Sequence, residues 1–243
     1  MSDPSLYDSY VTFKNWGESA VIQLPENFVC LLRGSGAPLR SLDILDYGFG
    51  DGTFLDWAKR EGHSVTGVEI LPAMVAAATA RGHTAFLADD DNAWVGERRF
   101  DVITLLDVME HLDAAGFKAL MALGRKALKP GGMILARFPN GDSPFFGRYH
   151  YGDLTHERPL SAGAVDQRAR PEGMTVARAF NPRPIPPGFA RAVKQRLAYL
   201  VRDIVETVLG FGYFGYRFPM DPNVAVVLMR TEEARLEQAG QTG

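Results

Sequence analysis

The chain is poor in cysteine, in long apolar runs and in excess charge of either sign. Its 243 residues include one cysteine, Cys30, which excludes an internal disulfide. The formal net charge is −3, and a nucleic-acid partner is not expected because it would favour a basic surface. No run of about 18 uncharged apolar residues occurs, so no transmembrane helix is expected. The polar first nine residues lack the regions of a signal peptide, and we expect a cytoplasmic protein.

Internal repeats and low-complexity tracts are also missing. No group of His, Cys and acidic residues has metal-ligand spacing, so the sequence predicts no metal site. The length fits one domain with an added segment. We expect a single domain over 1–243, with an N-terminal cap segment at 1–40 and a core at 41–180 and 222–230. An inserted helical segment would occupy 181–221, and a loose tail 231–243.

Short apolar runs alternate with helical stretches from Ser41 onwards. Strands are predicted at 42–46, 65–70, 84–87, 100–106 and 133–138, and helices at 53–60, 72–80 and 114–128. The run at 100–106 is almost entirely apolar, which is typical of a strand buried on both faces. Strands that return after helix-length intervals predict an α/β fold with a parallel sheet and right-handed crossovers.

The second half of the chain is less regular. Strands are predicted at 175–180 and 224–229, and a proline-rich connector leads to an amphipathic helix at 190–209. Its apolar side chains recur at intervals of three to four. We expect this helix to cover the sheet or an acceptor site. The alternative is a weak membrane-surface contact or a homodimer contact that helps to reach a lipid-linked acceptor. The apolar positions are Phe189, Val193, Leu197, Val201, Ile204 and Val208.

A glycine-rich turn follows the first predicted strand. Positions 46–52 read Asp-Tyr-Gly-Phe-Gly-Asp-Gly. Glycines allow a sharp turn and a close ligand approach, and the next helix offers free N–H groups at its start. Glu69, at the end of the second strand, can accept hydrogen bonds from two ribose hydroxyls. The spacing is neither that of a dinucleotide fingerprint nor that of a P-loop.

These segments resemble the motifs of class I methyltransferases that depend on S-adenosylmethionine (SAM). The turn at 45–52 looks like their first motif, Val68-Glu69 like their ribose-binding acid, and 100–112 like their fourth-strand motif. The segment 128–132 resembles the turn before their fifth strand. The resemblance implies a Rossmann-like, doubly wound, mostly parallel sheet of seven strands with helices on both faces. It also implies that SAM is the cofactor.

The same resemblance implies roles for single residues. The donor site would comprise the first-motif residues and Glu69, with Leu106 and Asp107 beside the methionine part of the donor. An acid after the third strand would hold the adenine amino group, and Asp89, then Asp90, is favoured over Asp91. The first-motif residues in question are Asp46, Gly48, Gly50 and Gly52.

The loop after the fifth strand contains Asp153-Leu154-Thr155-His156. It resembles a segment in methyltransferases related to the ubiquinone-biosynthesis enzymes, many of them from bacterial glycan or secondary-metabolite pathways. An alcohol acceptor needs a general base, and histidine is well matched near neutral pH. His156 is therefore the candidate base, with Asp153 to orient it or to bind the acceptor. In the alternative interpretation both residues only fix the loop, and the neighbouring His150 is also a candidate.

We therefore expect SAM-dependent O-methylation of a small-molecule or glycan hydroxyl. The alternatives are an N- or C-methyltransferase of a metabolite, or a SAM-binding protein without catalysis. A nicotinamide-dependent oxidoreductase is disfavoured by the spacing of the glycines.

Overall fold

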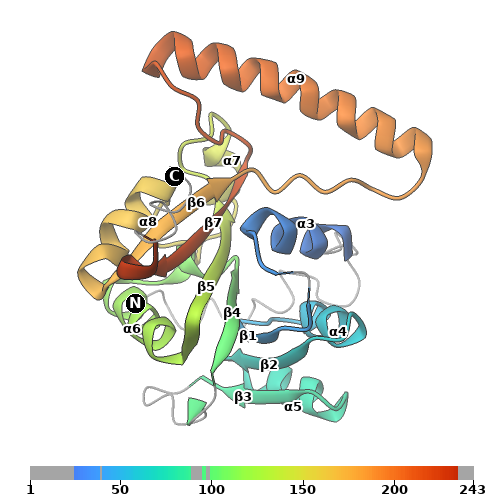
Figure 1. The fold of residues 1–243 in the computed structure, drawn as a ribbon, viewed down its shortest axis with the longest axis vertical. Helices are drawn as coiled ribbons and strands as arrows, with labels where there is room; N and C mark the ends of the chain where they lie inside the picture. The colour runs from blue at the N-terminus through green and yellow to red at the C-terminus, as the bar shows by residue number, and fades with distance from the viewer. Residues whose placement is uncertain (1–24, 39, 89–94, 97–98, 235–243) are drawn as a thin grey trace.

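The structure, a computed structural model, describes residues 25–38, 40–88, 95–96 and 99–234. It contains a seven-stranded sheet with helices on both faces (Figure 1). The strands are β1 Asp43–Tyr47, β2 Ser64–Glu69, β3 Thr84–Leu87, β4 Phe100–Leu106, β5 Leu128–Pro139, β6 Met174–Phe180 and β7 Asn223–Arg230. The helices are α3 Pro25–Ser35, α4 Thr53–Arg60, α5 Pro72–Ala80, α6 Ala114–Ala127, α7 Phe146–His150, α8 Ala162–Ala169 and α9 Phe189–Phe214, with 3-10 turns η2 Met109–His111 and η3 Arg170–Glu172.

The strand order is β3-β2-β1-β4-β5-β7-β6. Neighbouring strands from β3 to β5 pair in parallel, and β7 runs antiparallel to both β5 and β6. The predicted mostly parallel, seven-stranded sheet is therefore confirmed. Every residue of β4 is buried, as a central strand covered on both faces requires.

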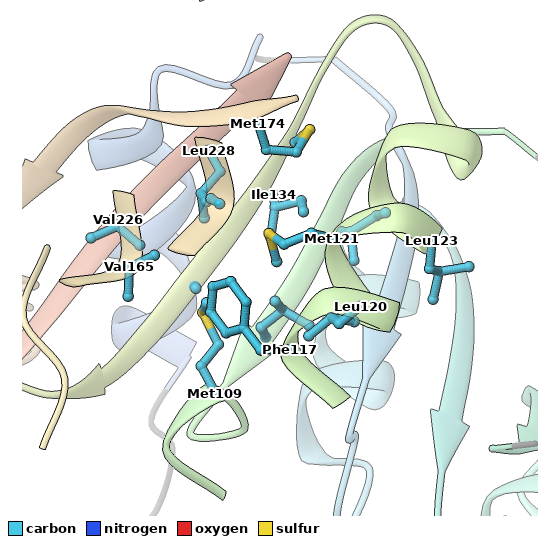
Figure 2. Packing of buried hydrophobic residues seen from close by; sticks show 14 of the residues in the cluster. Met109, Phe117, Leu120, Met121, Leu123, Ile134, Val165, Met174, Val226 and Leu228 are labelled. Atoms are coloured by element: carbon cyan, nitrogen blue, oxygen red, sulfur yellow. The ribbon is translucent and has the colours of Figure 1, made fainter. Parts of the chain in front are cut away.

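Two hydrophobic clusters lie on opposite faces of the sheet. On one face, α3 and α4 pack through Phe28, Phe54 and Trp57. On the other, α6 and α8 pack through side chains such as Phe117 and Val165. Figure 2 shows the second cluster, in which side chains of α6 and α8 meet those of β5, β6 and β7. The helices that cover both faces hold the carboxyl ends of β1, β2 and β4 in a fixed arrangement.

Two helix starts are set by side chains. Asp113 accepts a hydrogen bond from the Gly116 N–H at the start of α6, and Ser161 accepts one from the Ala164 N–H at the start of α8. A hydroxyl or carboxylate at this position satisfies an N–H that has no partner within the helix.

The fifth strand begins earlier than predicted. The segment 128–132 was expected to be a turn, but it belongs to β5, and Leu128 pairs with Phe100 across a register shift. A Cβ on Gly132 would lie 3.0 Å from the Phe100 carbonyl oxygen. The glycine therefore permits a close backbone approach within the sheet instead of ending it.

Helix α9 differs most from expectation. It extends through Phe214 and lies apart from the helices that cover the sheet (Figure 1). The apolar side chains predicted to cover the sheet or an acceptor site are exposed, from 38% at Val193 to 88% at Phe189. The expectation that this apolar face covers the sheet is therefore wrong. No helix in the described part of the chain combines the length and apolar character that crossing a membrane requires.

Candidate functional site

The loop between β1 and α4 depends on glycine at three positions. Gly48, Gly50 and Gly52 have φ angles of 77°, 59° and 79°, in the left-handed region that side chains disfavour. A Cβ on Gly48 would lie 2.6 Å from Val108 Cγ2, and one on Gly52 would collide with the Arg81 guanidinium. The backbone conformation and the neighbouring side chains therefore both require glycine where the first predicted motif turns.

Glu69 joins this loop to the end of β2. Its side chain is buried, and Oε2 accepts a 2.9 Å hydrogen bond from the Gly50 N–H. Oε1 accepts from the N–H groups of Ile70, at 2.7 Å, and Leu71, at 3.2 Å. The structure thus brings together the glycines and the acid that the sequence assigned to one donor site.

Asp46, at the end of β1, is buried and unusually basic. Burial raises its pKa to about 7, against the hydrogen bond from Thr104, and the charges of Glu69 and Asp51 raise it further. The Thr104 hydroxyl donates to Oδ1 at 2.7 Å. A carboxyl in this state gains a full negative charge most readily when a cation lies beside it.

Leu106 and Asp107 mark the end of β4. Leu106 is buried, whereas Asp107 is partly exposed. Asp107 has a φ of 58° and is the only non-glycine residue with a positive φ among the described residues. Asp107 Oδ1 accepts a 3.1 Å hydrogen bond from Arg137 Nε, and Oδ2 accepts a second from Nη2. Burial lowers the pKa of Arg137, but the charge of Asp107 and its hydrogen bond raise it above its usual value. This bidentate pair fixes the backbone between β4 and β5 at the candidate site.

The loop after β5 holds Asp153 and His156 close together. His156 Nε2 lies 3.8 Å from Asp153 Oδ2, and the two side chains are 6% and 8% exposed. Asp153 Oδ1 also accepts hydrogen bonds from the N–H and hydroxyl of Thr155, at 3.0 and 2.5 Å. The His156 Nδ1 is 3.2 Å from the His150 carbonyl oxygen. Both side chains are therefore buried within the loop. The role of His156 as a base stays a prediction.

One group of side chains could hold a metal ion, although the sequence predicted no metal site. Glu110, His111 and His156 offer ligand atoms that lie within 4.8 Å of one another. His111 Nδ1 is also 2.9 Å from the Thr155 hydroxyl oxygen. Spacing along the chain gave no signal for this group, because η2 and the loop after β5 are distant in sequence. The absence of a metal stays a prediction.

A cavity of about 210 Å³ lies at the ends of β5 and β7. Sequence reasoning missed it, because its walls come from six separate segments. Its lining includes Arg137, whose guanidinium pairs with Asp107 of the predicted donor site. The lining residues are Asn27, Leu31, Arg137, Tyr149, Pro182, Pro184, Arg202, Asp221, Pro222 and Asn223. The predicted adenine contacts, Asp89 and Asp90, lie outside the described residues.

Comparison with known proteins matches the chain to one family. A family model described as "Methyltransferase domain" matches residues 27–179. The chain is 30% identical over 105 residues to a ubiquinone biosynthesis O-methyltransferase of Methylobacterium nodulans, which is 41% of each chain. It is 31% identical over 136 residues to the protein of that name from Cereibacter sphaeroides, covering 53% of this chain and 54% of the relative. The chain thus matches about half, or less, of the length of these curated relatives.

Two solved structures share the fold. A SAM-dependent methyltransferase from Archaeoglobus fulgidus has a TM-score of 0.61 at 17% identity, with 90% of this chain and 98% of that chain covered. The plantazolicin methyltransferase BpumL, solved with a monoazolic desmethylPZN analog and SAH, has a TM-score of 0.60 at 17% identity, with 93% and 91% covered. At these identities the likeness concerns the fold alone.

Proposed function

The chain belongs to the methyltransferase domain family, and from this we propose that it transfers a methyl group from SAM to a hydroxyl oxygen of a small molecule or glycan. SAM is the cofactor of this class I family. The curated relatives that resemble part of the chain are named as O-methyltransferases, which favours oxygen as the methyl acceptor.

Glu69 provides the observation that carries the proposal. Its buried carboxylate accepts a hydrogen bond from the N–H of Gly50 and so lies against the glycine-rich turn between β1 and α4. A carboxylate here can accept hydrogen bonds from ribose hydroxyls, which would share its oxygens with the backbone donors. Leu106 and Asp107 would adjoin the methionine part. When bound, SAM supplies an electrophilic methyl group on a positively charged sulfur.

Asp46 fits a cationic donor. Its pKa of about 7 leaves the carboxyl partly protonated near neutral pH, and a nearby positive charge would favour the ionised form. The positive charges of SAM, on sulfur and on its amino group, provide such a partner. We assign Asp46 to holding the donor through charge, with Thr104 orienting the carboxylate.

The cavity beside Arg137 suits the methyl acceptor. Its volume of about 210 Å³ fits a small molecule or one sugar unit of a glycan. The lining combines the apolar Leu31 with charged and amide groups from Arg202, Asp221 and Asn223, which can hydrogen-bond hydroxyl groups. This cavity is the acceptor site in our proposal.

The acceptor hydroxyl must lose a proton during transfer, and we assign its removal to His156. The His150 carbonyl oxygen, 3.2 Å from the His156 Nδ1, would hold a proton on that nitrogen and leave Nε2 to accept the hydroxyl proton. Asp153, 3.8 Å from Nε2 and itself held by Thr155, would then stabilise the charged imidazolium. The His156 side chain is 6% exposed, so the loop that carries it must open towards the acceptor. Two alternatives remain: His150 removes the proton, or His156 and Asp153 only fix the loop.

A methyl-transfer screen tests the acceptor class. The full chain is incubated with SAM that carries a labelled methyl group, in separate panels of phenols, sugars and amines. We expect labelled hydroxyl compounds and a loss of labelling in His156→Ala that leaves SAM binding intact. Labelling of amines or carbon centres alone would contradict O-methylation. SAM binding with no labelled product in any panel would favour a SAM-binding protein without catalysis.

A further inference from the structure

Helix α9 turns an apolar face to solvent. Six large apolar side chains recur along it at intervals of three or four residues, which places them on one side of the helix. They are between 38% and 64% exposed. We call this set the outer face of α9: Val193, Leu197, Leu200, Ile204, Val208 and Phe211.

The opposite, polar side of α9 faces the rest of the protein. Glu206 is 3% exposed, and its carboxylate accepts hydrogen bonds from Asn181 at 2.9 Å, the Met220 N–H at 2.7 Å and Arg217 at 2.9 Å. Arg183 donates to Asp203 on the same side at 2.7 Å. Rotating α9 to bury its outer face against the body would break these ion pairs.

This orientation is the reverse of that in most surface helices. An amphipathic helix of a globular protein buries its apolar face and exposes its polar face. Large exposed apolar patches with polar borders mark interaction sites. Because the ion pairs of Glu206 and Asp203 fix the helix, its outer face remains available to an external partner.

The charges on α9 indicate the chemistry of that partner. Arg191, Lys194 and Arg196 are exposed in the first part of the helix, and none forms an ion pair with another residue in the described ranges. The acidic residues of α9, Asp203 and Glu206, pair with Arg183 and Arg217. At 3.6 residues per turn, Lys194 and Arg196 lie on the two flanks of the outer face, whereas Arg191 lies on the far side of the helix. The exposed charge beside the outer face is therefore positive.

The end of α9 is rich in exposed aromatic side chains. Between 57% and 80% of the residue surface is exposed at Phe211, Tyr213 and Phe214 in the last turn of α9 and at Tyr216 just after it. Tyrosine combines an apolar ring with a polar hydroxyl, a combination suited to the boundary between lipid and water. Phenylalanine adds apolar area that can enter the acyl boundary.

We propose that the outer face of α9 docks on an anionic lipid bilayer, with the helix axis parallel to the membrane surface. The apolar side chains would enter the boundary between headgroups and acyl chains, and Lys194 and Arg196 would contact the headgroups. The inference goes beyond methyl transfer, because docking requires neither SAM nor an acceptor. A second copy of the chain is a poorer fit, since its α9 offers the same cations, and both carboxylates of that helix already pair with Arg183 and Arg217.

Flotation with vesicles tests the proposal on the full chain. Vesicles of phosphatidylcholine containing about one third phosphatidylglycerol should bind the protein, and pure phosphatidylcholine should bind it at least tenfold less. Raising the salt from about 0.1 M to about 1 M should weaken binding, because it screens the cations. Ile204→Glu should lower binding at least tenfold, and Lys194→Glu combined with Arg196→Glu should remove the preference for anionic vesicles.

Ala119→Glu, on the exposed side of α6, is the matched control for an added charge and should bind vesicles as the wild type does. Each variant is first checked by its melting temperature and by its stabilisation by SAM, since the outer face lies outside the folded core. Absence of vesicle binding, or equal binding by wild type and Ile204→Glu, would overturn the proposal. A stable dimer that Ile204→Glu dissociates in analytical ultracentrifugation would also overturn it, by assigning the face to a second copy.

Discussion

Thr104 on β4 donates a 2.7 Å hydrogen bond to the carboxylate of Asp46 on β1, at directly paired positions of the two strands. Both side chains are buried. Burial raises the pKa of Asp46 to about 7 even though this hydrogen bond lowers it. The carboxyl beside the donor loop therefore changes its charge near neutral pH. With the role proposed above for Asp46, donor binding would be coupled to proton release.

The affinity for SAM should rise with pH up to about 8. A cationic donor favours ionised Asp46, so below the folded-state pKa of about 7 binding must release a proton. The affinity should fall by up to tenfold for each pH unit below that value. Calorimetric titration at about pH 6, 7 and 8, in buffers of different ionisation enthalpy, measures both effects. A pH-independent affinity without proton release would contradict this role for Asp46.

Asp46→Asn should stabilise the ligand-free protein at about pH 8 while weakening SAM binding. The folded-state pKa, about 7, lies above the unfolded value near 3.9, so the folded state binds more protons between these values. Stability is therefore lost as pH rises from about 4 to about 7, and an uncharged Asn avoids the loss. We expect a gain of about 1–3 kcal/mol at pH 8 and none at about pH 4. Urea denaturation at both values checks this, and destabilisation at pH 8 would contradict it.

Glu69→Ala should weaken SAM binding by about 10- to 100-fold, because charge-assisted hydrogen bonds are worth about 1.5–3 kcal/mol. The change also removes the acceptor for the Gly50 N–H, so the loop loses its contact with β2. The matched control is Glu61→Ala, at an exposed position after α4, which should bind SAM as the wild type does. Calorimetric titration of the folded variants with SAM measures both affinities. Equal affinities of the two variants would place the ribose contact elsewhere.

Gly48→Ala should cost more stability than Gly62→Ala. Both glycines have a positive φ, 77° and 85°, so each alanine carries a backbone penalty of about 1–2 kcal/mol. A Cβ at position 62 meets nothing within 4 Å, whereas one at position 48 lies 2.6 Å from Val108 Cγ2. Thermal unfolding of both variants separates the backbone strain that they share from the Val108 contact that only position 48 makes, and SAM titration measures the effect on donor binding. Only Gly48→Ala should lose SAM affinity, and unchanged binding by this variant would count against the loop assignment.

The sheet and the donor loop were predictable because their signals are local. The predicted strands are short apolar runs, and the turn at 46–52 carries its three glycines at alternate positions within seven residues. The start of β5 was not predictable in this way. Gly131 and Gly132 are typical of a turn, and only the pairing of Leu128 with Phe100 shows that they lie within a strand.

Properties that depend on distant residues could not be obtained from the sequence. The spacing of Val193 and Leu197 predicts an amphipathic helix, but it does not say which side faces the protein. That is decided by the partners of Glu206, namely Arg183 and Arg217, which lie outside the helix. The cavity beside Arg137 and the raised pKa of Asp46 likewise arise only when separate strands and helices meet.

Calorimetric titration of the full chain with SAM, with NAD as the matched control, tests the central claim most directly. We predict one SAM site with a dissociation constant on the order of micromolar. SAM at about 100 times that constant should stabilise the fold by about 2.7 kcal/mol. NAD should give neither binding heat nor a shift in melting temperature. No heat and no shift with SAM or S-adenosylhomocysteine at about millimolar concentration, a thousandfold excess over the expected constant, would contradict the account.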